Sequence, residues 1–362
     1  MSLKLQAPDY IRAISPYLPG KPITEVAREL GIPVEGIVKL ASNENPLGMS
    51  PRAKKAVEAA LSGAERYPDQ FELVSALAAR LGVDATQIVL GNGSNDVLDL
   101  AARVFIAPGR SAVFSRHAFA VYPLATMSAG GTCLVAEAKD YGHDLVAMRA
   151  LVREDTRVIW IANPNNPTGN FLPYAEVRDF LASVPVDVAV VLDEAYNEYL
   201  APADRADTVQ WIRDFPNLIV TRTFSKVYGL AGVRVGYAVA APEIADLMNR
   251  VRQPFNVNNL ALAAATAALD DHLFIAESYE LNRRGMEQVV AGLKRLGLAH
   301  IPSHGNFVTF AVADGAAVNR KLLQQGVIVR PIGGYGLPNH LRVTIGLETE
   351  NARFLDALAK AL

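Results

Sequence analysis

Short apolar runs alternate with amphipathic stretches through the middle of the chain. The apolar runs predict strands at 87–90, 111–114, 132–135, 157–161, 186–192, 218–220 and 233–239. Between them, hydrophobic residues at helical spacing predict helices at 96–105, 174–184 and 207–215. This alternation is typical of a mostly parallel sheet with helices on both faces, in which ligands bind at the carboxyl ends of the strands.

The pattern changes after about residue 255. An alanine-rich run at 260–269 predicts a tightly packed buried helix, and an amphipathic stretch at 273–296 predicts a helix that bridges to a second unit. Strands are expected at 304–312, 327–331 and 340–345, with helices at 317–326 and from 348. We therefore predict an N-terminal segment (1–44) packed on the small domain, a large domain (45–257) and a small α+β domain (258–362).

Composition narrows the possible partners and compartments. With 51% hydrophobic and 20% charged residues, the 362-residue chain has a globular composition. The net charge is −2 and basic residues form no block, so we expect neither nucleic acid nor a membrane as a partner. Cys133 is the one cysteine, which excludes an internal disulfide; we expect a small buried side chain in a reducing compartment. We expect no secretory signal and no membrane span, and therefore a cytoplasmic protein.

Lys226 has the most informative surroundings in the chain. The hydroxyl residues Thr223 and Ser225 precede it, and Arg234 follows eight positions later. A lysine in such a setting can form a Schiff base with an aldehyde, and hydroxyls with a guanidinium can hold a phosphate. An aldehyde together with a phosphate suggests pyridoxal phosphate, whose pyridine nitrogen needs an acidic partner. Most lysines are solvated surface charges, so this interpretation depends on other segments that fit the same cofactor.

An acid that fits this cofactor ends an apolar run at Asp193. Burying an aspartate is costly without a cation, and a protonated pyridine nitrogen is such a cation. Tyr196, three positions later, could hydrogen-bond the ring phenolate, whereas Glu194 is expected to face elsewhere. The alternative is that Asp193 caps a helix at the strand end.

Two loops at predicted strand ends add further polar groups. In 90–96, two glycines allow close backbone approach, and the helix start at Ser94 and Asn95 offers N–H groups to a phosphate. The alternative is a turn in which Ser94 or Asn95 is the N-cap. In 163–169, two prolines and a glycine fix a loop that aims the Asn166 amide at the ring phenolate, unless the loop is an ordinary turn.

Aromatic and basic residues complete the candidate site. Phe119 and Tyr122 are three apart, so they would share a helical face; one could stack on a pyridine ring, or both could pack in the core. Arg330 and Arg342 each interrupt an apolar strand and could clamp an anionic group of the substrate, or form structural salt bridges. The six histidines show no metal-ligand spacing and no Gly-x-Ser-x-Gly is present, so neither a metal site nor a serine hydrolase is expected.

Together these segments resemble the fold-type I pyridoxal-phosphate aminotransferases and, more narrowly, the histidinol-phosphate aminotransferases. The resemblance runs nearly end to end, and the segments that carry it are 15–22, 40–48, 66–69, 91–94, 163–169, 193–196, 222–237, 252–257 and 341–346. It implies a mostly parallel central sheet covered by helices, plus a smaller α+β domain. The chain departs from the family at Asn95, where an acid is frequent, and at His117, where a proline is frequent.

The resemblance also implies roles for individual residues. Lys226 would be the Schiff-base lysine, Asp193 would pair with the pyridine nitrogen, and Phe119 would stack on the ring. Asn166 and Tyr196 would hold the ring oxygen. The phosphate would be held by Ser94, Asn95, Thr223, Ser225 and Arg234. Tyr67 would reach the phosphate of a neighbouring subunit, which implies a homodimer with shared active sites. The substrate side would be formed by Tyr17, Arg330 and Arg342.

The implied reaction is reversible transfer of an amino group between histidinol phosphate and 2-oxoglutarate in histidine biosynthesis, giving imidazole acetol phosphate and glutamate. Lys226 would release the cofactor by transaldimination and then act as the general base. An aromatic amino-acid aminotransferase and, after it, a threonine-phosphate decarboxylase are the alternatives, because residue types alone do not separate them. From another class, the alternative is a non-catalytic effector-binding module.

Overall fold

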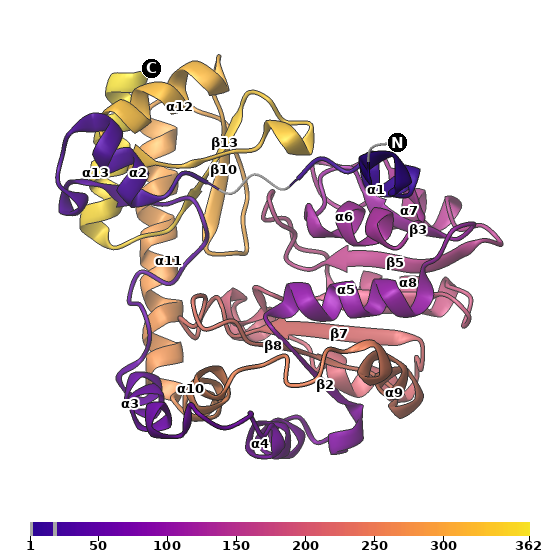
Figure 1. Ribbon diagram of the computed structural model, residues 1–362. Coiled ribbons are helices and arrows are strands. Elements are labelled where there is room, and N and C mark those ends of the chain that lie inside the picture. The colour runs from indigo at the N-terminus through magenta and orange to yellow at the C-terminus, as the bar shows by residue number, and fades with distance from the viewer. Residues whose placement is uncertain (1–2, 17–19) are drawn as a thin grey trace.

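A seven-stranded sheet forms the centre of the larger part of the computed structural model, which describes residues 3–16 and 20–362 (Figure 1). In spatial order its strands are β2 (Ile88–Gly91), β8 (Gly236–Val239), β7 (Leu218–Thr223), β6 (Ala189–Asp193), β5 (Thr156–Ala162), β3 (Ser111–Ser115) and β4 (Thr132–Ala136). β8 is antiparallel to both of its neighbours, and the remaining pairs are parallel. The predicted mostly parallel sheet is therefore confirmed.

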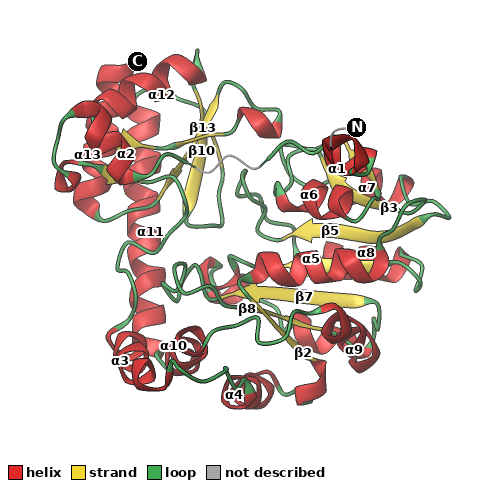
Figure 2. Ribbon diagram, viewed as in Figure 1, coloured by secondary structure: helices red, strands yellow, loops and turns green. Residues whose placement is uncertain are grey.

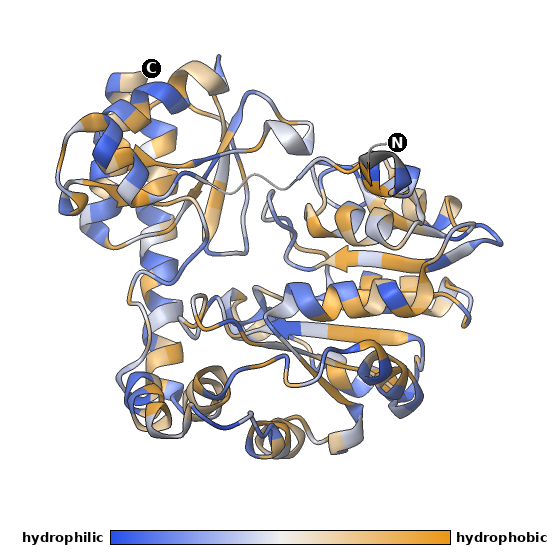
Figure 3. Cartoon of the chain, viewed as in Figure 1, coloured by the Kyte–Doolittle hydropathy of each residue, from blue (hydrophilic) through white to orange (hydrophobic). Residues whose placement is uncertain are grey.

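Helices cover both faces of this sheet (Figure 2). One face packs on α5 (Ser94–Phe105), α6 (Val121–Ser128) and α9 (Pro242–Val251). The other packs on α3 (Pro51–Ala60), α4 (Phe71–Leu81), α7 (Leu145–Ala150), α8 (Tyr174–Ser183) and α10 (Asn259–Leu269). Successive residues of a strand face opposite sides, so Val190 lies in one core and Val191 in the other. The strands are apolar for this reason, and Figure 3 shows hydrophilic residues gathering at the carboxyl end of β7.

A second, smaller part contains an antiparallel sheet. Its strands, in spatial order, are β12 (Arg330–Pro331), β13 (His340–Thr344), β10 (Phe307–Ala311) and β9 (His300–Ile301). Its helices are α11 (His272–Arg295), α12 (Gly315–Gln324) and α13 (Glu348–Ala361). α11 runs from beside α3 and α10 into the smaller part, as the expected bridging helix does (Figure 1).

The N-terminal residues contact both parts. β1 (Val38–Lys39) pairs in parallel with β11 (Val327–Ile328), and α2 (Ile23–Leu30) packs against the same small core. α1 (Asp9–Arg12) lies instead beside α6 of the larger part. The domain boundaries at residues 44 and 257 stay a prediction.

Some local expectations differ from the structure. The stretch 207–215 forms a 3-10 helix, Thr208–Arg213, instead of an α-helix. The proline that follows Phe215 disfavours α-helical geometry at Phe215 itself. The strand expected at 233–239 begins only at Gly236, because Arg234 has a φ of 65°, which extended backbone does not allow. Within the described residues, no helix is both long and apolar enough to cross a membrane.

Candidate active site

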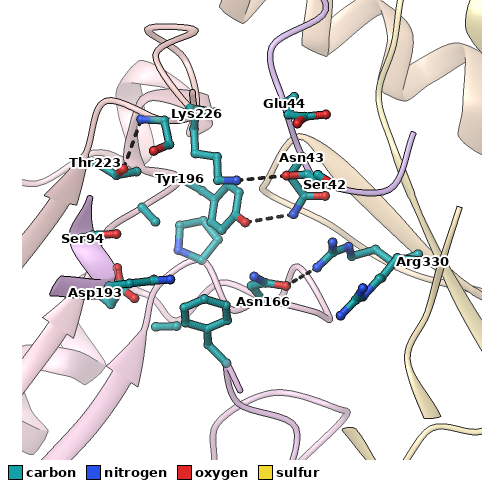
Figure 4. A pocket seen from close by; sticks show the side chains of 18 of the residues that line it. Ser42, Asn43, Glu44, Ser94, Asn166, Asp193, Tyr196, Thr223, Lys226 and Arg330 are labelled. Atoms are coloured by element: carbon teal, nitrogen blue, oxygen red, sulfur yellow. Dashed lines mark hydrogen bonds between the residues drawn. The ribbon is translucent and has the colours of Figure 1, made fainter. Parts of the chain in front are cut away.

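A cavity of about 360 Å³ lies beyond the carboxyl ends of β5, β6 and β7, facing the smaller sheet (Figure 4). Almost all of the residues expected at the site line it: Ser94, Asn95, Phe119, Asn166, Asp193, Tyr196, Thr223, Ser225, Lys226, Arg234, Arg330 and Arg342. Tyr67 does not line the cavity, and Tyr17 lies outside the described residues. Parallel strands bring these distant segments together because their carboxyl ends share one edge of the sheet.

Asp193 is a buried acid at the end of β6, with 4% of its surface exposed. Tyr122 Oη donates a hydrogen bond to Asp193 Oδ2 at 2.9 Å, and Thr221 Oγ1 donates to Oδ1 at 3.2 Å. Burial raises the pKa of this carboxyl to about 6, although the two hydroxyl hydrogen bonds act in the opposite direction. A cation placed beside Asp193 would favour the ionised form and lower this pKa.

Lys226 follows β7 and extends its amine into the same cavity (Figure 4). Its Nζ donates to the Ser42 carbonyl at 3.2 Å and lies 5.8 Å from the centre of the Tyr196 ring. Burial, followed by the positive charges of Arg342 and Arg234, lowers the pKa of the amine to about 8. The lowered pKa enlarges the neutral fraction of the amine near neutral pH, which makes this lysine a candidate nucleophile.

An anion cradle lies at one side of the cavity. α5 begins at Ser94, and Gly93 occupies its N-cap position with a φ of 86°. A Cβ atom on Gly93 would lie 2.4 Å from Arg234 Nη2, so only glycine lets the guanidinium pack against this loop. Ser225 also faces Arg234, with 3.5 Å between Oγ and Nη1. Free helix N–H groups, hydroxyls and a guanidinium together suit a phosphate. The alternative of a Ser94 or Asn95 N-cap is wrong.

The structure separates the two aromatic candidates. Tyr122 is wholly buried and stacks on Trp160, with 5.3 Å between ring centres and 4° between planes. Phe119 lines the cavity and meets Tyr122 edge-on. The geometry therefore favours Phe119 for stacking on a planar ligand, and gives Tyr122 the separate task of holding Asp193.

The side of the cavity formed by the smaller part carries the guanidinium groups of Arg330 and Arg342. Arg342 Nη1 donates to Asn166 Oδ1 at 2.5 Å, and its Nη2 donates to the Ala41 carbonyl at 2.9 Å. Arg330 and Arg342 are register partners on the neighbouring strands β12 and β13.

Sequence reasoning missed the contribution of 42–44. Asn43 Nδ2 donates to Tyr196 Oη at 2.9 Å, Ser42 accepts from Lys226, and Glu44 lines the cavity. In the sequence this segment stands out only through the family resemblance. The signal that it carries is two asparagines on either side of a glutamate, followed by a proline.

Glu194 faces away from the cavity, as expected. It is fully buried and accepts hydrogen bonds from Arg222 Nη2 at 2.8 Å, and from Tyr174 Oη and Thr208 Oγ1, each at 2.9 Å. This ion pair joins the ends of β6 and β7 on the side opposite the cavity.

Two other singled-out residues lie outside the cavity. Tyr67 is 80% exposed and stacks on Phe255, with 4.5 Å between ring centres. Cys133 is half-buried, and burial raises the pKa of its thiol to about 11, which favours the unreactive thiol form.

Comparison with known proteins places this arrangement in a family. The model of aminotransferase classes I and II matches residues 35–358. A histidinol-phosphate aminotransferase of Dechloromonas aromatica is 76% identical over the full length of both chains, and one of Thiobacillus denitrificans is 60% identical over 98% of this chain and 93% of its own.

Among solved structures, a histidinol-phosphate aminotransferase from Sinorhizobium meliloti, crystallised with pyridoxal-5′-phosphate, has a TM-score of 0.90 and 28% identity, covering 98% of this chain and 96% of the other. An aspartate aminotransferase from Thermus thermophilus, with maleate, shares the fold with a TM-score of 0.85 at 21% identity, covering 98% of this chain and 99% of the other. The chain therefore belongs to the class I and II aminotransferases and, within them, to the histidinol-phosphate aminotransferases.

Proposed function

We propose that this protein transfers an amino group between histidinol phosphate and 2-oxoglutarate, with pyridoxal phosphate as its cofactor, in histidine biosynthesis. The observation that carries the proposal is one cavity that joins a buried acid, a lysine of lowered pKa and an anion cradle. Full-length identity of 76% to a protein named histidinol-phosphate aminotransferase supports the substrate.

The cavity residues fit pyridoxal phosphate. Asp193 would meet the ring nitrogen, since the buried carboxyl has hydroxyl partners and accommodates a cation. Phe119 would stack on the ring, while Asn166 and Tyr196 would hold the ring oxygen. The phosphate would lie in the cradle, held by Ser94, Asn95, Thr223, Ser225 and Arg234.

Pyridoxal phosphate, when bound, supplies an aldehyde that captures amines and a ring that accepts electrons. With the cofactor bound, Asp193 would keep a proton on the ring nitrogen, which strengthens the electron demand of the ring. Lys226 Nζ would be the base that takes the proton from the substrate α-carbon and returns it during the transfer. Its low pKa, caused by burial and two guanidinium groups, keeps this amine available as a base.

The two substrates carry different anions, and one site must hold both in turn. Histidinol phosphate has a phosphate and no α-carboxylate, whereas glutamate has two carboxylates. The planar guanidinium groups of Arg330 and Arg342 can bind either kind of anion. Tyr17 is the third residue proposed for this side of the site.

A homodimer with shared active sites is part of the proposal, as is a cytoplasmic location. Tyr67 and Phe255 form an exposed aromatic pair outside the cavity of their own chain. A second copy would cover this pair and receive the Tyr67 hydroxyl at its own phosphate site.

The first prediction concerns uptake of pyridoxal phosphate by the cofactor-free protein. Only the neutral amine attacks an aldehyde, so the uptake rate should rise with pH and level off above about 8. Stopped-flow absorbance measures the rate, with Nα-acetyl-lysine as the reference amine and Lys226→Ala as the control that should develop no Schiff-base absorbance band. A rate that keeps rising to pH 10 would contradict the lowered pKa, and a protein that takes up no cofactor would contradict the function.

The second prediction concerns Asp193. Asp193→Ala should lower kcat by roughly 10³-fold, about 4 kcal/mol, because the ring nitrogen loses its charged partner. Tyr122→Phe is the matched control: it removes one hydrogen bond to Asp193 and leaves the carboxylate, so about a tenfold loss is expected. Circular dichroism checks that both variants are folded. Near-normal turnover by Asp193→Ala would mean that another acid fills this role.

The third prediction concerns shared active sites. Sedimentation should give twice the 38.9 kDa mass of one chain. Co-expressed Tyr67→Ala and Lys226→Ala chains should be more active than either alone, because a mixed dimer contains one site with both residues native. Lys226→Ala with Asp193→Ala is the control, since both residues belong to one chain's cavity and no mixed site is native. A monomeric protein, or no gain from the first mixture, would refute sharing.

The fourth prediction concerns the substrate. With 2-oxoglutarate as acceptor, kcat/KM for histidinol phosphate should exceed that for phenylalanine by at least roughly tenfold, about 1.4 kcal/mol. Decarboxylation of threonine phosphate should be slower still. Arg342→Ala should impair both half-reactions, whereas the exposed Arg284→Ala should impair neither. If phenylalanine is the better donor, the protein is an aromatic aminotransferase and the substrate assignment is wrong.

A further inference from the structure

A histidine outside the expected site joins the two parts of the protein at the cavity. His117 lies in the turn after β3, two residues before Phe119, with 9% of its surface exposed. Its Nδ1 lies 2.6 Å from the carbonyl oxygen of Tyr335, in the 3-10 turn Gly333–Tyr335 of the smaller part. A carbonyl oxygen can only accept, so Nδ1 carries the proton and donates.

The turn that receives this hydrogen bond forms part of the cavity wall. Tyr335 lines the cavity, as does Arg330 in β12, the strand that precedes the turn. Gly336 follows with a φ of 77°, and a Cβ atom there would lie 3.6 Å from His117 Cε1. The imidazole therefore packs closely against the turn as well as bonding to it.

A row of rings runs beside the hydrogen bond and crosses between the same two parts. The ring centre of Tyr141 lies 6.1 Å from that of His117 and 5.7 Å from that of His340. His340 begins β13, two residues before Arg342. The row thus ends on the strand that carries a proposed substrate-binding guanidinium.

His117 is itself held firmly by the larger part. Its carbonyl accepts a hydrogen bond from Asn165 Nδ2 at 2.9 Å, and the same amide donates to Thr168 Oγ1 at 2.7 Å. Asn165 precedes Asn166, so the loop that presents Asn166 to the cavity also anchors His117. A donor anchored in this way can fix the position of the turn relative to the larger part.

We propose that His117 is a positioning residue for substrate binding: its Nδ1–H holds the Gly333–Gly336 turn so that Tyr335 keeps its place in the cavity wall. The turn connects β12, which carries Arg330, to β13, which carries Arg342. Loss of the donor should therefore weaken substrate binding more than it slows proton transfer. The kinetic part of this inference rests on the proposed function, whereas the effect on the turn does not.

Three substitutions separate the donor from the ring. His117→Asn keeps an N–H at the position of Nδ1 without the imidazole. His117→Leu has the shape of asparagine without a donor, and His117→Phe keeps ring volume beside Tyr141 without a donor. Steady-state kinetics with histidinol phosphate and 2-oxoglutarate, and hydrogen exchange of the peptide that spans 333–340 in cofactor-free protein, are measured for each.

The phenylalanine and leucine variants should raise the KM for histidinol phosphate about tenfold, equal to about 1.4 kcal/mol, with kcat within about threefold of the wild type. Exchange at 333–340 should quicken in both, and His117→Asn should stay within about twofold of the wild type in every measurement. A folded leucine or phenylalanine variant with wild-type KM and exchange would overturn the proposal, as would an asparagine variant as impaired as these two. If the wild type itself does not use histidinol phosphate, the proposed function fails, while hydrogen exchange still decides whether His117 holds the turn.

Discussion

The cost of burying charge is the constraint on which this site depends. Asp193 ends a strand whose every residue is buried, and its pKa is raised to about 6 for that reason. Hydrogen bonds from Tyr122 and Thr221 orient the carboxylate but supply no positive charge. A protonated ring nitrogen beside it would lower the cost of ionising it, and the same contact would keep the ring electron-poor. The fold thus holds an acid in a place where a cationic ligand is favoured.

Glu194, the residue after Asp193, is also a buried acid, but its charge is paired within the protein. Glu194 is paired with Arg222 inside the protein and accepts two further hydroxyl hydrogen bonds. Removing one partner of a buried pair typically costs about 3–5 kcal/mol, because the other charge is left unpaired. Since Glu194 directly follows β6 and Arg222 lies in β7, the pair fixes the strand ends that present Asp193 and Thr223. The two adjacent acids therefore have different roles. Glu194 stabilises the strand ends, and Asp193 faces the ligand site.

Positive charge reaches the cavity from both parts of the chain. Arg342 comes from the smaller sheet and Arg234 from the larger part, and both lower the pKa of Lys226. Asn43 links the parts from a third direction, because its N–H donates to Thr344 Oγ1 at 2.9 Å and its side chain donates to Tyr196. The position of the smaller part therefore influences the chemistry of a lysine that follows a strand of the larger one.

The sequence by itself determined the class of fold and most of the cavity residues. Strand and helix periodicities are local, and polar residues after apolar runs mark strand ends, which parallel topology brings to one edge. This is why the sequence alone places Asp193, Asn166 and Lys226 together. The φ of Arg234, which shortens a strand, does not follow from periodicity.

Only the tertiary structure decided which segments far apart in the chain contact one another at the site. Asn43 meets Tyr196 across 153 positions and Arg342 meets Asn166 across 176, and no periodicity reports such pairs. Packing of Tyr122 on Trp160 assigned that tyrosine to Asp193 and left Phe119 in the cavity. Local secondary-structure propensity depends on residues that are neighbours in the sequence. These contacts depend instead on how the two sheets and the segments between them pack together.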